Sequence, residues 1–159
     1  MKTAVPVLVF SLIASSVVAQ YSPGLQISAR LLRDKARLDE PVPIEIKVLN
    51  TSDKPIYVYG DLNYFITLFA STLDGKGLPQ DFIRETMAPP PSKEDFSRLE
   101  PGHFLGTIWN QSLKDLGIRA SGRYRLDFEF RSNFDSALAF GLSVWRGRAS
   151  TTLEITVEP

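Results

Sequence analysis

The stretch "SGRYRLDFEFRS", residues 121–132, alternates apolar and charged side chains with a period of two. The apolar side chains on one side are Tyr124, Leu126, Phe128 and Phe130. The charged side chains on the other are Arg123, Arg125, Asp127, Glu129 and Arg131. A period of two is typical of a strand with one face in a core. We therefore predict a strand with a solvated charged face, whose alternating signs let the side chains pair along and across a sheet.

The same period recurs before and after this stretch. We predict further strands at 25–32, 41–50, 55–60, 63–71, 80–87, 103–109, 143–150 and 151–159. Asp74-Gly75 predicts a tight turn between two of them, because such turns need positive φ. No segment of twelve or more residues keeps a 3.6-residue period. The chain is therefore predicted to be all-β, with about seven to nine strands in one domain.

Two segments interrupt the strand pattern. Residues 88–102, "APPPSKEDFSRLEPG", are Pro-rich and show no period, so we predict a surface loop rather than a regular element. Residues 110–118 predict one helical turn that directs Leu113 and Leu116 inward.

The first nineteen residues have the layout of a secretory signal. Lys2 precedes an apolar run that ends in Val17-Val18-Ala19. We predict a signal peptide at 1–19, a mature domain at 20–159 and a secreted or periplasmic location. The chain has no Cys, so disulfides and thiolate metal sites are excluded.

The charge of the chain argues against two classes of partner. Of 18 basic and 18 acidic residues, only Lys2 lies in the signal segment, which leaves the mature domain with a net charge of −1. Nucleic acid and an anionic membrane surface attract a basic domain. We therefore expect neither as a partner after the signal is removed.

Catalytic chemistry finds little support in the residues. His103 is the single histidine and follows Pro101-Gly102, which is a turn context. A catalytic triad needs a base held by an orienting acid, and no motif places one here. We expect no enzymatic activity, no metal and no cofactor.

Leu116, Gly122 and Tyr124 resemble the corner that precedes the penultimate strand of immunoglobulin-like sandwiches. In that corner the tyrosine hydroxyl bonds to backbone upstream. The wider pattern resembles the single immunoglobulin-like or fibronectin-type domains of exported bacterial proteins. The resemblance implies an immunoglobulin-like antiparallel β-sandwich with a largely buried Tyr124, and it leaves function open.

Two functional hypotheses remain. The first is a non-catalytic binding or accessory module that contacts a protein or a glycan through the Pro-rich loop or a sheet edge. The aromatic face around Tyr64 and Phe65 is a further candidate surface. The second is an inhibitor of extracellular proteases that presents the loop 87–93. The loop residues of interest are Met87, Pro89, Pro90 and Pro91. Proline presets φ, so this segment would lose little entropy on binding.

Overall fold

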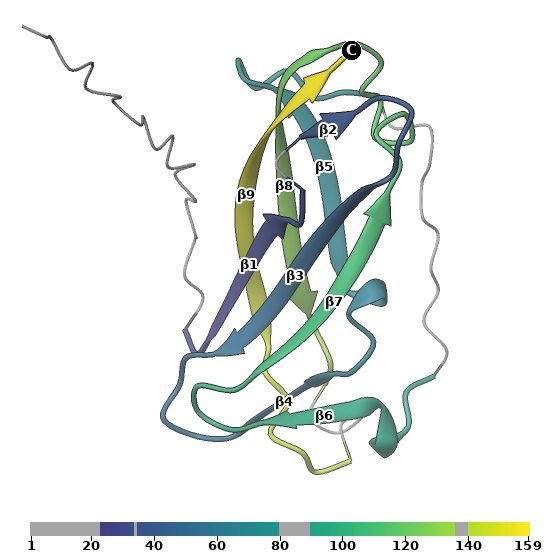
Figure 1. The fold of residues 1–159 in the computed structure, drawn as a ribbon. Coiled ribbons are helices and arrows are strands. Elements are labelled where there is room, and N and C mark those ends of the chain that lie inside the picture. The colour runs from purple at the N-terminus through teal and green to yellow at the C-terminus, as the bar shows by residue number, and fades with distance from the viewer. Residues whose placement is uncertain (1–22, 34, 80–89, 136–139) are drawn as a thin grey trace, which may run out of the picture.

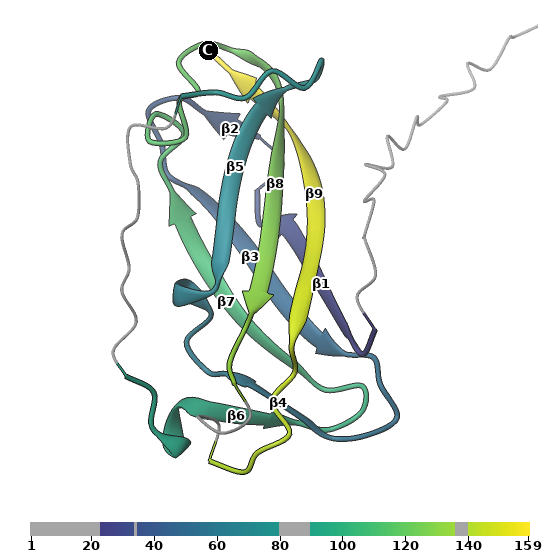
Figure 2. The same ribbon diagram turned by 180° about the vertical axis from the view of Figure 1, so that it is seen from behind.

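The computed structural model describes residues 23–33, 35–79, 90–135 and 140–159. In this part the chain forms nine strands and two single-turn 3₁₀ helices. Figures 1 and 2 show a three-stranded sheet facing a four-stranded sheet, with a small two-stranded sheet at one end. The prediction of an all-β fold is therefore confirmed.

The three-stranded sheet is antiparallel and has the order β1-β3-β7. Its strands are β1 (Leu25–Leu31), β3 (Val42–Asn50) and β7 (Phe104–Gln111). β3 alternates buried and partly buried residues along its whole length, as the period of two predicts. β7 lies at one side of this sheet, so no other described strand pairs with its outer edge.

The four-stranded sheet has the order β2-β9-β8-β5. Its strands are β2 (Ala36–Arg37), β5 (Ile66–Thr72), β8 (Gly122–Ser132) and β9 (Gly147–Glu158). The stretch that opened the sequence analysis is β8, and it pairs with β5 on one side and β9 on the other. β2 joins the opposite edge in parallel with β9.

The prediction of a loop at 88–102 is wrong in part. Residues 93–95 form the 3₁₀ helix η2 (Lys93–Asp95), and the strand β6 (Phe96–Leu99) follows it directly. β6 pairs antiparallel with β4 (Ile56–Tyr59) to form the small sheet. The strand has only four residues, with Phe96 and Leu99 buried at its two ends. It therefore shows no alternation that a period of two would detect.

Two predicted strand boundaries also need correction. In the 63–71 segment the strand starts only at Ile66, because the 3₁₀ helix η1 (Leu62–Tyr64) comes first. The Asp61 side chain caps this helix by accepting a hydrogen bond from the Asn63 backbone N–H. In the 143–150 segment the strand starts only at Gly147, and Val144 forms a single bridge with Tyr57 of β4. A local side-chain bond competes with the sheet ladder at Asp61, whereas Ser143 and Trp145 form their backbone bonds with Tyr57.

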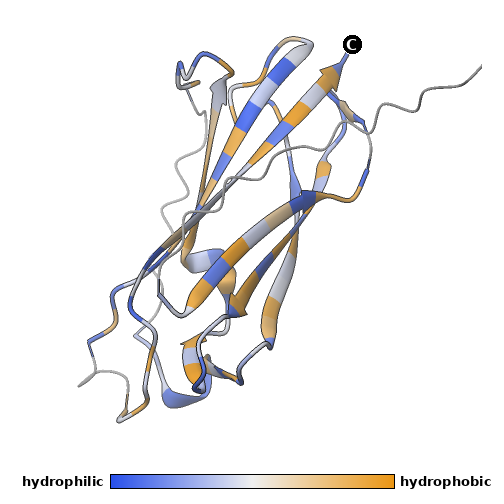
Figure 3. Ribbon diagram, turned by 90° about the vertical axis from the view of Figure 1, so that its left-hand side faces the viewer, coloured by the Kyte–Doolittle hydropathy of each residue, from blue (hydrophilic) through white to orange (hydrophobic). Residues whose placement is uncertain are grey.

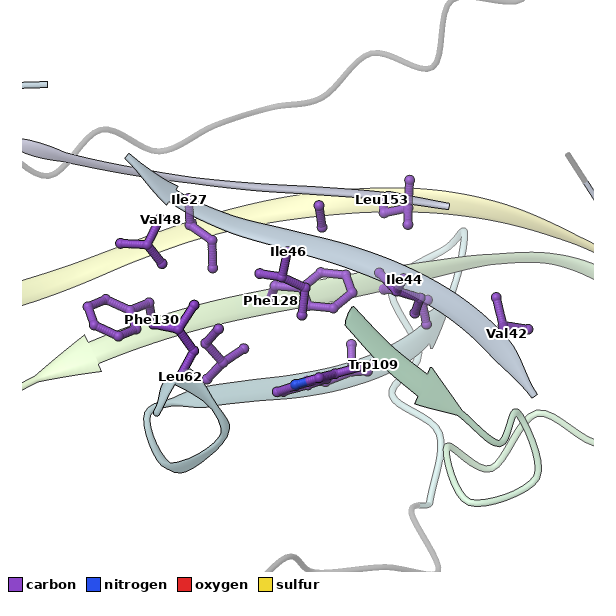
Figure 4. Close-up of a cluster of buried hydrophobic side chains, with 14 of the residues drawn as sticks. Ile27, Val42, Ile44, Ile46, Val48, Leu62, Trp109, Phe128, Phe130 and Leu153 are labelled. Carbon is purple, nitrogen blue, oxygen red and sulfur yellow. The ribbon is translucent and has the colours of Figure 1, made fainter. Parts of the chain in front are cut away.

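The hydrophobic core lies between the two larger sheets. Figure 3 shows the alternation of hydrophobic and hydrophilic residues along the strands, and Figure 4 shows buried side chains from facing strands meeting in the middle. Ile46 of β3 and Phe128 of β8 are both fully buried there. Leu113 and Leu116 are buried in this core, as predicted, at a turn where the Leu116 N–H donates to the Leu113 carbonyl oxygen.

Asn50 ends β3 and is fully buried. Its Nδ2 donates to the carbonyl oxygens of Lys54, at 2.8 Å, and of Leu99, at 2.9 Å. Its Oδ1 accepts from the backbone N–H of Ser52, at 2.9 Å, and from the Ser52 hydroxyl, at 2.7 Å. One side chain thus joins the turn after β3 to the end of β6. A buried amide with all these bonds formed is stabilising only while each partner stays in place.

Thr151 on β9 gives a stability prediction. It is buried, and its hydroxyl has no hydrogen-bond partner among the described residues. A buried polar group without a partner loses about 1–3 kcal/mol of solvation. Thr151→Val keeps the branched shape and removes the hydroxyl, so the free energy of unfolding should rise by about 1 kcal/mol. Urea denaturation of the two proteins checks this, and a lower midpoint for the valine variant would contradict it.

Candidate functional site

The Pro-rich loop proposed as a binding element is described only at its end. Met87 and Pro89 lie outside the described residues, while Pro90 is exposed and Pro91 is half-buried. The Ser92 backbone N–H and hydroxyl both donate to Asp95 Oδ2, at 2.7 and 3.0 Å. This capping arrangement fixes the loop end against β6. The protease-inhibitor hypothesis depends on residues 87–93 and stays a prediction.

Tyr64 and Phe65 take part in an aromatic cluster instead of forming a free surface. Both are half-buried, and both pack on the buried ring of Tyr59, with ring centroids 6.2 Å away for Tyr64 and 4.8 Å away for Phe65. Phe96 and Phe134 pack on the same ring from other sides. Burial, followed by the negative charge of Asp95, raises the pKa of Tyr59. The cluster therefore packs the small sheet against η1 and the end of β8.

Two of the corner residues, Gly122 and Tyr124, lie against each other. Leu116 is buried, and the Tyr124 hydroxyl donates to the Ala120 carbonyl oxygen at 3.0 Å. Gly122 has φ of 152°, and a Cβ there would lie 3.6 Å from the Tyr124 ring. Tyr124 itself is partly buried and packs against the core. Its ring lies against Gly122 at the start of β8.

The charged face of β8 is paired as predicted, but one residue of it is not solvated. Glu129 is only 8% exposed. Arg131 of the same strand donates to its Oε1 at 2.7 Å, and Arg148 of β9 pairs with its Oε2. The long arginine side chains lie over the carboxylate and remove it from water. The remaining pairs are exposed, and exposed pairs contribute little to stability.

The surface that stands out chemically is β7. The strand carries no charged residue from Phe104 to Gln111. On its outer face Phe104 is 55% exposed and Ile108 is 56% exposed. Natural proteins usually protect a sheet edge with charges, proline or a covering segment. β7 has neither charge nor proline, which marks its edge as a place where another strand can pair.

The backbone groups that such a strand would meet follow from the register. The Asn50 N–H donates to the His103 carbonyl oxygen at 3.0 Å, one position before the Leu49–Phe104 pair. Backbone groups of successive residues in an antiparallel strand point to alternate sides. The residues that direct their N–H and C=O groups away from β3 are therefore Phe104, Gly106, Ile108 and Asn110. These same residues carry the outward side chains of the strand.

β7 is held rigidly in place from its inner side. Trp109 points into the core (Figure 4) and is 9% exposed. Its Nε1 donates to Asn63 Oδ1 of η1 at 2.6 Å. This bond connects the edge of the three-stranded sheet to the segment that enters β5.

The edge of β5 makes a useful comparison. β5 also lacks charge, and its Phe69 is 52% exposed. However, residues 76–78 fold back on its second half, where the Leu78 N–H donates to the Ala70 carbonyl oxygen at 3.0 Å and Ser71 bridges Gly77. The turn predicted from Asp74-Gly75 supplies this cover. No described segment covers β7 in this way.

The neighbouring strand β3 adds charge beside the β7 edge. Lys47 Nζ lies 4.9 Å from the centroid of the Phe104 ring and 3.0 Å from Glu45 Oε2. Arg30 of β1 bonds to the same carboxylate oxygen at 2.5 Å. Hydrogen bonds from Arg30 and then Lys47 lower the pKa of Glu45. The outer face next to β7 thus has one cation placed over an exposed aromatic ring.

Other kinds of site were sought in the same part of the chain. Among the described residues, no three or more His, Asp or Glu side chains come close enough to hold a metal ion. His103 is exposed after its turn, as the sequence predicted. No helix of the described part is long and apolar enough to cross a bilayer.

Sequence reasoning did not single out β7 as a site. The segment was recognised as a strand, and its lack of charge was visible, but its edge position depends on the order of strands in the sheet. Comparison with known proteins supplies no further assignment: no family model and no curated protein matches this chain.

Proposed function

We propose that this chain is an exported, non-catalytic binding module with an immunoglobulin-like sandwich, which pairs with an extended segment of a partner protein along β7. The observation that carries the proposal is the uncharged edge of β7, on which Phe104 and Ile108 are more than half exposed. An extended segment that joins a sheet edge gains main-chain hydrogen bonds, while alternate side chains give specificity. β7 offers both the unpaired main-chain groups and the outward side chains that such pairing uses.

Two features support the remaining parts of the proposal. The hydroxyl bond of Tyr124 to Ala120, with Gly122 against the tyrosine ring, resembles the corner of immunoglobulin-like domains. The signal-like segment at 1–19 and the lack of Cys suit a protein made for export from bacteria.

A protein partner suits the site better than a glycan. Sugars stack on exposed flat rings, but Trp109 and Trp145 are 9% and 7% exposed, the aromatic cluster around Tyr59 is packed, and the exposed rings of Phe69 and Phe104 lie on different sheets. The β7 edge offers backbone donors and acceptors together with apolar side chains. Polypeptide backbone complements such a surface directly.

The proposal predicts a specific loss of binding in one variant. Ile108→Lys places a charge at the centre of the edge, as natural edge strands do to prevent pairing. The mature protein with this change should retain its partner at least about tenfold more weakly, which corresponds to about 1.4 kcal/mol. Its thermal stability should change little, because the side chain points outward.

Phe69→Lys is the matched control, because it adds the same charge at an equally exposed apolar residue on β5. Each protein is immobilised and exposed to secreted and cell-surface proteins of the source organism, and retained proteins are quantified by mass spectrometry. A protein kept by wild type and Phe69→Lys but lost by Ile108→Lys supports the proposal. Retention that is equal for all three proteins, or no greater than on a blank support, rejects it.

A further inference from the structure

Residues 76–79, which we call the strap, run antiparallel to the second half of β5 and close that edge of the four-stranded sheet. The Thr72 N–H donates to the Lys76 carbonyl oxygen at 3.0 Å, and the Leu78 N–H donates to the Ala70 carbonyl oxygen at 3.0 Å. Ala70 and Thr72 therefore direct backbone groups toward the strap, which keeps them from pairing with another chain.

The side chains of the strap hold it in place only weakly. Leu78 is half-buried and packs on the core, whereas Lys76, Gly77 and Pro79 are exposed. A segment with few buried apolar contacts and exposed hydrogen bonds opens at a low free energy. The strap should therefore open far more readily than the strands beneath it, unless another segment of the chain helps to hold it.

The turn that follows β7 provides such a segment. Gly117 has a φ of 77°, and its N–H donates to the Lys114 carbonyl oxygen at 2.9 Å. The Ile118 N–H donates to the Leu113 carbonyl oxygen at 3.0 Å. These two bonds form the Schellman arrangement, in which the left-handed position is usually glycine. Leu113 and Ile118 are fully buried, so the core fixes this turn.

Gly117 is also the residue on which the strap lies. A Cβ on Gly117 would overlap the Pro79 carbonyl oxygen and would lie 3.2 Å from Leu78 Cβ. The strap backbone thus approaches the turn more closely than any side chain at Gly117 would allow. The left-handed conformation alone does not require this approach. Gly102 has a φ of 76°, and a Cβ there would meet no atom within 4 Å.

We infer that the bare backbone of Gly117 holds the strap on β5, and that the strap in turn keeps this edge from pairing with other chains. β5 carries no charge, and its Phe69 is 52% exposed. A long uncharged edge is a template for association unless a loop covers it. The inference concerns β5 alone and does not depend on the proposed role of β7.

A side chain at position 117 should displace the strap and leave the turn in place. The turn is anchored by the fully buried side chains of Leu113 and Ile118. The strap is anchored by one half-buried side chain, that of Leu78. The element with less buried apolar surface moves at the lower cost.

Gly117→Asn tests this contact, because asparagine tolerates the left-handed conformation while the overlap with Pro79 remains. Native-state hydrogen exchange of the mature protein measures the opening at each amide. The amides of Thr72 and Leu78 should exchange at least about tenfold faster than in wild type. Their rates should depend little on low concentrations of urea, because local opening exposes little surface. The Ile118 amide, in the turn, should speed up less than the Leu78 amide.

Gly102→Asn is the matched control, because it places the same residue in the same conformation with open space around it. It should leave the Thr72 and Leu78 amides at their wild-type rates. Equal acceleration in both variants would assign the effect to backbone strain and overturn the inference. Faster exchange at Ile118 with an unchanged rate at Leu78 would show that the turn moves, and would also overturn it.

Sedimentation velocity tests the protective role of the strap. Gly117→Asn should self-associate at concentrations at which Gly102→Asn sediments like wild type. Adding Phe69→Lys should reverse the association, because a charge on an edge strand opposes pairing. If Gly117→Asn does not fold, Leu78→Ser loosens the strap from its other anchor and should give the same reversible association. A loosened strap without self-association, or association that persists with Phe69→Lys, rejects edge protection by the strap.

Discussion

Asn50→Asp should lower the free energy of unfolding by about 3 kcal/mol or more at pH 7. The new carboxylate would still accept the two bonds from Ser52, but its second oxygen would face the carbonyl oxygens of Lys54 and Leu99. The buried Leu99 carbonyl would lose its donor, at about 1–3 kcal/mol, the Lys54 carbonyl would keep only the Ser52 hydroxyl, and a buried charge would be added.

The loss should also depend on pH in a defined direction. Burial beside two carbonyl oxygens raises the pKa of the new carboxyl in the folded protein above its value in the unfolded chain. The folded variant then binds more protons than the unfolded one, so its stability falls as pH rises from about 4. The deficit relative to wild type should therefore be smaller near pH 4 than at pH 7.

Urea denaturation at both pH values measures these free energies. Asn110→Asp makes the same chemical change at an exposed position and should be nearly neutral. Equal losses in the two variants, or a deficit at Asn50 that does not vary with pH, would show that the amide does not join the two segments as described.

Phe128→Ala should cost about 3–5 kcal/mol of unfolding free energy. The side chain is fully buried in the middle of β8, opposite Leu68 of β5 and Thr151 of β9, and lies in the same cluster as Ile46 of β3 (Figure 4). Truncation of such a ring removes apolar contacts from both sheets and leaves a cavity that the strands cannot close.

Phe69→Ala on the neighbouring strand is the control, since its ring is 52% exposed. It should cost less than about 1 kcal/mol. Chemical denaturation of both variants gives the comparison. If the alanine variant does not fold, Phe128→Leu replaces it in the comparison. Leucine keeps most of the side-chain volume, so its loss of unfolding free energy should lie between those of Phe69→Ala and Phe128→Ala. Similar losses of unfolding free energy for Phe128→Ala and Phe69→Ala would contradict the assignment of Phe128 to the core.

The longer elements of the fold could be predicted from the sequence because their signal is local. β3, β8 and β9 alternate over nine or more residues, so the buried face is visible residue by residue. β6 was missed because four residues with buried ends give no alternation. Ser92 and Asp95 did carry a local sign of η2, since a capping box has this spacing. β2 has two residues and forms only against the distant β9.

The candidate site could be predicted less well than the fold. Whether a strand lies at an edge depends on which strands pair, and such pairings are long-range. The exposure of Ile108 therefore could not be read from its neighbours in sequence. Glu129 was expected to be solvated for a similar reason, because Arg148, which covers it, comes from another strand.

The bond of Trp145 to the segment that precedes β1 has a mechanical consequence. Trp145 Nε1 donates to the Pro23 carbonyl oxygen at 3.0 Å, just before β1, and β9 ends at the opposite end of the sandwich (Figure 1). A pulling force between these two points acts parallel to the strands. The hydrogen bonds between β1 and β3 and those between β9 and β8 then share the load, because the strands are pulled past one another in shear. A force perpendicular to the strands would break these bonds one by one. The module is therefore built to resist extension along its long axis.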